Sequence, residues 1–169
     1  MSALSTLLRS GRPLHLIILD ASAAMTLEAD AAGLAAAHPD LGYLAVAHRD
    51  ALVLQTSLAL PGHLYDGLGT VAASLRPSVA VVAVPEWSGP VAPWAQLTAA
   101  HHGRATPGFL YDPDAGVTWA RRFDLQPNPQ VDEPWPRLAV QVQDTSGAVI
   151  ETQDIFTFAH AAAMAPRCR

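Results

Sequence analysis

The sequence lacks lysine, has one cysteine and carries few charged side chains. All ten basic residues among the 169 are arginines, so neither a P-loop lysine nor a Schiff-base lysine is present. With Cys168 as the sole thiol, a disulfide framework is excluded, and so is an iron–sulfur cluster held by this chain's own cysteines alone. No uninterrupted run of about 18 apolar residues occurs, so no membrane span is predicted.

The charge and hydropathy of the chain limit its partners. A net charge of −5 argues against general nucleic-acid binding. Residues 1–6 lack a basic region followed by an apolar core, so we predict no secretory signal and expect a cytoplasmic location. Hydrophobic residues make up 50% of the chain. That share is high for a soluble domain and indicates that part of the surface is buried against a partner.

The pattern of apolar residues predicts a single α/β domain over residues 1–169. Segments 14–20 and 78–84 are mostly apolar, and the first ends in Asp20, as is typical of buried parallel strands. Helical segments between them favour a mainly parallel sheet with flanking helices over residues 1–110. Residues 111–169 are expected to form a small antiparallel C-terminal appendage and a final helix.

Further elements follow from local patterns. Apolar residues at helical spacing predict a helix opened by Pro61-Gly62-His63 and another over Trp94–His102. Alternation and a turn sequence predict a hairpin of Leu138–Val142 with Val149–Thr152. The same reasoning predicts helices over Ser5–Ser10, Leu27–Ala37 and Ile155–Met164, and strands over Leu41–Ala47 and Ala51–Thr56.

Asp20 is the polar residue best placed for ligand binding. It ends the first apolar strand, and open α/β sheets bind ligands beyond the carboxyl ends of their strands. A helix N-cap or turn acceptor is the other interpretation of this aspartate. The residues that follow offer neither a glycine-rich phosphate loop nor a cluster of metal ligands.

Other polar clusters give weaker signals for chemistry. His48-Arg49-Asp50 is either an acid–base cluster or a solvated turn. Ser57 has no evident base, and no Gly-x-Ser-x-Gly elbow is present. The adjacent pair His101-His102 points to different sides of a helix, which disfavours a shared metal ion. Asp112-Pro113-Asp114 lacks the twelfth-position ligand of a calcium loop.

Several collinear segments resemble a known family. Ser10-Gly11-Arg12-Pro13 before the first strand is similar to the family's "SGRPVKVLVLD", and residues 109–116 are similar to "VFRYDPDAG". Residues 124–129 resemble the "LDGNP" segment, and residues 52–57 with His63-Leu64 match a family strand and helix start. Together they resemble the C-terminal half of the thiamine-diphosphate domain of pyruvate:ferredoxin oxidoreductases, members of the 2-oxoacid:acceptor oxidoreductases.

Departures from that family decide what the resemblance implies. The family's magnesium-binding Gly-Asp-Gly lies upstream of the first strand, and this sequence begins after that point. Asp20 is retained, but Ala21 stands where the family has a magnesium-binding threonine, Thr26 stands for asparagine, and the Gly-Gly is missing. Magnesium requires nearly octahedral oxygen coordination. The isolated chain is therefore expected to hold no metal and no thiamine diphosphate, with Asp20 the one remaining cofactor-binding candidate.

Two functions from different classes remain. The first is a truncated, non-catalytic relative of the thiamine-diphosphate domain that associates with itself or with a partner subunit, because half a sheet leaves an open apolar edge. The second is the small subunit of a split 2-oxoacid oxidoreductase whose cofactor motif is on another chain. A separate small-molecule-binding role is a third reading. We expect Trp87, Trp94 and Arg104 to anchor the interface, because aromatic residues and arginine are enriched in interface cores.

Overall fold

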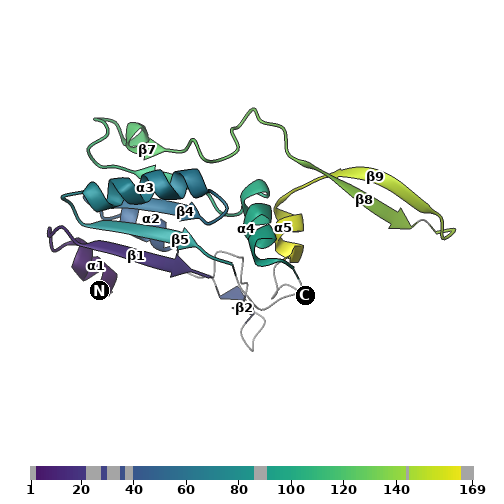
Figure 1. Cartoon of the computed structure of the whole chain (residues 1–169), viewed down its shortest axis with the longest axis horizontal. Helices are drawn as coiled ribbons and strands as arrows, with labels where there is room; N and C mark the ends of the chain where they lie inside the picture. Colours follow the sequence, from purple (N-terminus) through teal and green to yellow (C-terminus); the bar gives the residue numbers. More distant parts are fainter. Residues whose placement is uncertain are drawn as a thin grey trace.

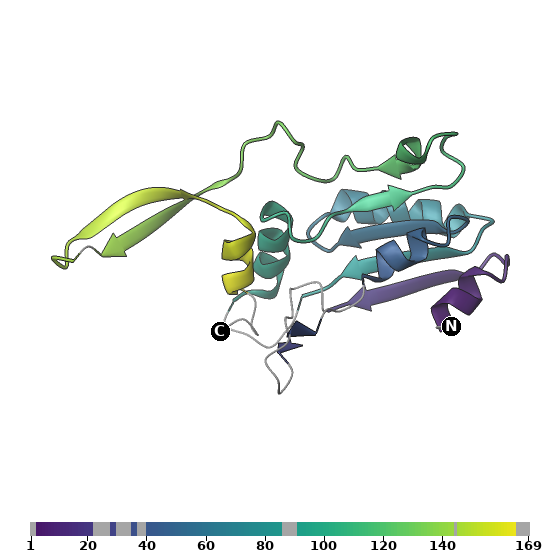
Figure 2. The same ribbon diagram turned by 180° about the vertical axis from the view of Figure 1, so that it is seen from behind.

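A five-stranded mixed sheet forms the centre of the protein (Figures 1 and 2). The computed structural model describes residues 3–21, 28–29, 35–36, 40–85, 91–143 and 145–164. The strand order is β1-β5-β4-β6-β7. Strands β1 (His15–Asp20), β5 (Ser78–Ala83) and β4 (Leu52–Ser57) are parallel, and β6 (Phe109–Tyr111) and β7 (Phe123–Asp124) add in antiparallel orientation. The predicted α/β class is confirmed, with antiparallel strands on one side.

Helices cover both faces of the central strands. Helix α3 (Pro61–Ala73) lies on one face, where Leu54, Ala80 and Val71 pack together. Helices α1 (Ala3–Leu8) and α2 (Leu41–Val46) lie on the other face. That second layer of the core also contains these buried sheet residues: Val53, Val79, Val81, Phe109 and Tyr111.

The predicted C-terminal appendage is a hairpin that projects away from the sheet (Figures 1 and 2). Strands β8 (Arg137–Gln143) and β9 (Val149–Ile155) pair in antiparallel register. Helix α5 (Phe158–Met164) then returns to pack against α4 (Pro93–His102). A short 3₁₀ helix, η1 (Trp119–Arg122), lies between β6 and β7. The final helix starts three residues later than predicted because Ile155 is the last residue of β9.

Two sequence-based predictions are wrong. The segment predicted as a strand over Leu41–Ala47 is helix α2, whose first turn is capped by Asp40 accepting from the Tyr43 N–H at 2.9 Å. A short apolar run does not separate strand from helix by periodicity alone. Within the segment predicted as a helix over Leu27–Ala37, the described residues form short strands instead, β2 (Glu28–Ala29) paired with β3 (Ala35–Ala36).

Candidate functional site

Two of the three parallel strands, β1 and β4, end in a short polar side chain, and β5 ends in Ala83. Asp20 ends β1, and its carbonyl accepts the Val84 N–H at 3.0 Å. Ser57 ends β4, is buried, and accepts the Ala59 N–H at 3.1 Å. Ser57 thus closes a turn, which is a structural role. The residues after Ala21 that the N-cap interpretation of Asp20 needs, 22–27, lie outside the described part of the chain, so both interpretations of Asp20 stay predictions.

His63 forms a contact that the sequence did not reveal. From the first turn of α3, its Nδ1 lies 2.9 Å from Thr56 Oγ1 at the end of β4. Its Nε2 is enclosed and has no hydrogen-bond partner. Burial lowers the pKa of His63, while the carboxylates of Asp124 and Asp66 act in the opposite direction. The contact with Thr56 ties α3 to the sheet, and burial of His63 favours its neutral form.

A recess of about 450 Å³ lies beside His63. Asp66 and Asp124 line it from α3 and β7, and Gln126 and Pro127 close it from the segment that follows. Asp124 already accepts the Gln126 N–H at 3.0 Å. Thr56 is the hydroxyl paired with the imidazole, and it is buried, so a nucleophile–base pair open to substrate is not formed here.

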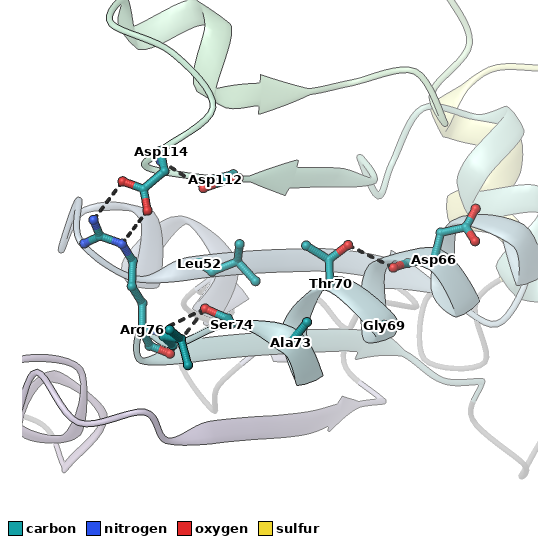
Figure 3. A pocket seen from close by; sticks show the side chains of 10 residues that line it. Leu52, Asp66, Gly69, Thr70, Ala73, Ser74, Arg76, Asp112 and Asp114 are labelled. Atoms are coloured by element: carbon teal, nitrogen blue, oxygen red, sulfur yellow. Dashed lines mark hydrogen bonds and ion pairs between the residues drawn. The ribbon is translucent and has the colours of Figure 1, made fainter.

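A larger recess, about 720 Å³, lies near the amino ends of the parallel strands (Figure 3). There the Arg76 guanidinium donates two hydrogen bonds of 2.7 Å to the Asp114 carboxylate. This pairing raises the pKa of Arg76. Asp112 accepts the Asp114 N–H at 2.8 Å, which holds the turn that presents the carboxylate. Asp114, in the Asp112-Pro113-Asp114 turn that resembles a calcium loop only superficially, thus forms an ion pair with Arg76.

The cluster His48-Arg49-Asp50 does not converge on one point. His48 Nε2 lies 3.1 Å from Ser5 Oγ, toward α1. The Arg49 carbonyl accepts the Tyr111 hydroxyl at 2.9 Å, and its guanidinium lies 5.6 Å from the Trp119 ring centre. These contacts fasten the α2–β4 turn to the core and leave no shared acid–base site.

The histidine pair lines a recess of about 470 Å³ together with Gln126 and Glu133. The His101 and His102 rings are tilted at 56°, and burial followed by the neighbouring imidazole lowers the pKa of His101. Among the described residues, no group of histidine, cysteine, aspartate and glutamate side chains is arranged to hold a metal ion. Within the same residues, no helix is long and apolar enough to cross a bilayer.

The three predicted interface residues differ in their surroundings. Trp87 lies outside the described residues. Trp94 is 63% exposed and lines an apolar recess of about 250 Å³ beside Leu58 and Pro85, at the carboxyl ends of β4 and β5. Arg104 is engaged within its own chain: its guanidinium lies 4.2 Å from the Trp135 ring centre and donates to two carbonyls of the 130–133 segment. Their role in an interface stays a prediction.

The outer side of β1 has no partner among the described strands. The Ser78 and Val84 N–H groups donate to the carbonyls of Leu14 and Asp20. By the two-residue repeat of a strand, the backbone groups of Ile17 and Leu19 therefore face away from β5. Their side chains are 56% and 68% exposed. We call the outward-facing backbone of β1, with these two side chains, the open edge.

The open edge lies beside α3 without being covered by it. Ile17 is in register with Ala80 and Leu54, which α3 covers. Helix α3 packs on β4 and β5 and leaves β1 bare on this face (Figure 1). Among the described strands, none pairs with the outer side of β1.

No family model and no curated protein matches the chain. The functional assignment rests on the residues and on the open edge.

Proposed function

We propose that the chain is a non-catalytic relative of the thiamine-diphosphate domain of 2-oxoacid:ferredoxin oxidoreductases and acts through association with itself or with a partner subunit. The open edge carries this proposal. Ile17 and Leu19 are large exposed apolar side chains, next to strand backbone that no described strand pairs with. An edge of this kind favours pairing with another chain.

The residues at the end of β1 support the non-catalytic part of the proposal. Ala21 follows Asp20 and has no side-chain oxygen to offer a cation. Magnesium takes oxygen ligands in near-ideal octahedral geometry, so one carboxylate leaves most of its shell to water. A thiamine diphosphate–magnesium complex is therefore not expected to be held by this chain alone.

The alternative is a split 2-oxoacid oxidoreductase, and one feature of the sheet favours it. β1 is a terminal strand of the parallel part of the sheet, so a strand from a second polypeptide can extend that part without disturbing β5. The second polypeptide would carry the Gly-Asp-Gly motif and the cofactor. This chain would then supply shape and substrate contacts.

Calorimetry tests whether the isolated chain holds the cofactor, and reconstitution with a second polypeptide separates the two proposals. Titration of the isolated chain with thiamine diphosphate and magnesium at millimolar concentration is expected to show no heat of binding. Magnesium-dependent binding in the micromolar range would contradict the non-catalytic assignment. A neighbouring gene whose product contains Gly-Asp-Gly provides the second arm: if that product and this chain together oxidise a 2-oxoacid and neither does so alone, the split enzyme is correct.

A further inference from the structure

The β8–β9 hairpin is a second unusually exposed element. Its strands are seven residues each, and all of these except the half-buried Val140 are exposed. Both views show the hairpin projecting beyond the sheet and helices (Figures 1 and 2). A lone two-stranded sheet is marginally stable in water, so a partner surface is expected to stabilise it.

One face of this hairpin carries more of the branched apolar side chains of β8 than the other, with Thr152 and Asp154 of β9 on the same side. The register pairs Val140 with Thr152 and Val142 with Ile150, which places Leu138, Val140, Val142 and Ile150 on the same face. The opposite face is mostly polar, with Arg137, Gln141, Gln143, Glu151 and Gln153, and it also carries Ala139, Val149 and Ile155. We call the side with Leu138, Val140, Val142 and Ile150 the apolar arm face.

The base of the hairpin is tied to the body of the protein. Before β8, Asn128 accepts the Gly108 N–H at 2.7 Å and donates to the Gly108 carbonyl at 2.5 Å. Next along the chain, Trp135 lies under Arg104. After β9, the Phe156 N–H donates to the Pro136 carbonyl at 2.7 Å. The arm is thus anchored on both sides of its base.

We propose that the apolar arm face of one copy packs on the open edge of a second copy, and that the exchange is reciprocal. The proposal deepens the association part of the proposed function and rests on it. Each chain has both an exposed apolar arm face and an open edge. A second copy can therefore cover both surfaces. Reciprocal exchange about a two-fold axis closes the assembly as a dimer.

Charge favours this pairing over arm against arm. Segment 9–15, which leads into the open edge, contains Arg9 and Arg12 and no carboxylate. Strand β9 contains two carboxylates and no arginine, and Asp154 lies on the apolar arm face whereas Glu151 lies on the opposite face. Bringing β9 to the open edge therefore sets opposite charges near each other, whereas two β9 strands side by side bring like charges together.

The contact area predicts a modest affinity. A seven-residue strand is about 23 Å long and a sheet layer about 10 Å thick, so one arm covers only a small strip. Two reciprocal contacts bury on the order of 900 Å² in total, just under the roughly 1,000 Å² that a biological interface should clear. A weak, concentration-dependent dimer is therefore expected, and a single arm contact would be too small.

Disulfide trapping between two different variants tests the pairing. In a Cys168→Ser background, a tagged Val142→Cys chain is mixed with untagged Ile17→Cys or Leu19→Cys chain and oxidised. A mixed disulfide is expected with at least one of the two edge positions. Gln141→Cys is the matched control, since it neighbours Val142 but lies on the polar face; its mixed product should be at least tenfold less abundant.

The other products identify other arrangements. If the main product is a disulfide between two Val142→Cys chains, the arms pack against each other. If it is a disulfide between two Ile17→Cys chains, the edges pack against each other. Either result overturns the proposal. Sedimentation provides an independent measurement without cysteines: Val142→Glu should raise the dimer Kd at least tenfold, and Gln141→Glu should leave it unchanged. If neither substitution weakens the dimer but Trp94→Ala does, the exchange is wrong while association stands. A strictly monomeric chain contradicts both.

Discussion

Neighbouring strands β5 and β1 have similar apolar sequences but different surroundings. All six residues of β5 are buried, whereas in β1 exposed and half-buried residues alternate. β5 has a strand on each side and helices on both faces, and β1 has one neighbour and one covered face. Strands buried on both faces read as continuous hydrophobic runs. The apolar sequence of β1 is therefore typical of a strand covered on both faces, and the described residues of one chain cover only one face of β1.

The largest expected effect contrasts two leucines on the same face of the sheet. Leu54 is fully buried under α3, and Leu19 is 68% exposed. Leu54→Ala should lower the free energy of unfolding by about 2–5 kcal/mol, through lost burial and a cavity. Leu19→Ala should change it by less than about 0.5 kcal/mol at submicromolar protein concentration. Urea denaturation followed by tryptophan fluorescence measures both, and equal losses would show that β1 is covered within the monomer.

A pair of glycines on α3 sharpens the same contrast. A Cβ at Gly67 would lie 2.4 Å from Leu54 Cδ1, while a Cβ at Gly69 meets nothing within 4 Å. Gly67→Ala is thus expected to cost about 1–3 kcal/mol by overpacking. Gly69→Ala should stabilise the helix by about 0.5–1 kcal/mol. Opposite signs in thermal denaturation are the predicted result; a stabilising Gly67→Ala would mean that α3 sits further from β4.

His63 predicts a smaller, pH-dependent effect. Burial holds the pKa of His63 below its ordinary value of 6.5 in the folded chain, so the unfolded chain binds the proton more readily. Stability is then complete above about pH 6.5 and falls as the pH drops toward the folded-state pKa. His63→Gln should flatten this part of the profile. Burial also lowers the pKa of His101, so a residual slope should persist; an unchanged slope after His63→Gln would show that His63 is not its source.

The smallest expected effect concerns the Arg76–Asp114 pair. Its geometry is bidentate, but the two side chains are 43% and 63% exposed. Exposed pairs contribute up to about 1 kcal/mol and are weakened by salt. A double-mutant cycle with Arg76→Ala and Asp114→Ala should give a coupling energy below that limit and near zero in molar salt. A coupling several times larger would mean that this turn is enclosed by another chain.

Strong local patterns explain which parts of the fold were predictable. Strand β4, strand β5, helices α3 and α4, and the β8–β9 hairpin each have a periodic or continuous apolar pattern bounded by turn residues, and each was predicted. Helix α2 was not, because its six residues are too few to show a helical period, and its helical state depends on the Asp40 cap and on packing under the sheet. The helical state of α2 is therefore set by its packing against the buried central strands, which its own six residues do not show.

The candidate site was less predictable because its contacts are long-range. The ion pair joins Arg76 to Asp114, 38 residues apart, and nothing in either local sequence indicates the other. The sequence predicts His63 only as part of the start of a helix. Its position in the first turn of the helix that follows β4 could have indicated a contact with the end of that strand. The sequence predicts an open apolar edge in general terms. Which face of β1 is exposed follows only from the strand register, which places Ile17 on the same face as Leu54.

Molecular mass in solution tests the central claim, that the open edge is covered by another copy, most directly. Size-exclusion chromatography with light scattering over a range of micromolar concentrations should show a mass rising from 17.8 kDa toward twice that value. Ile17→Glu should keep the mass at that of one chain, with an unchanged circular dichroism spectrum. A wild-type chain that stays monomeric and monodisperse at the highest concentration would contradict the account.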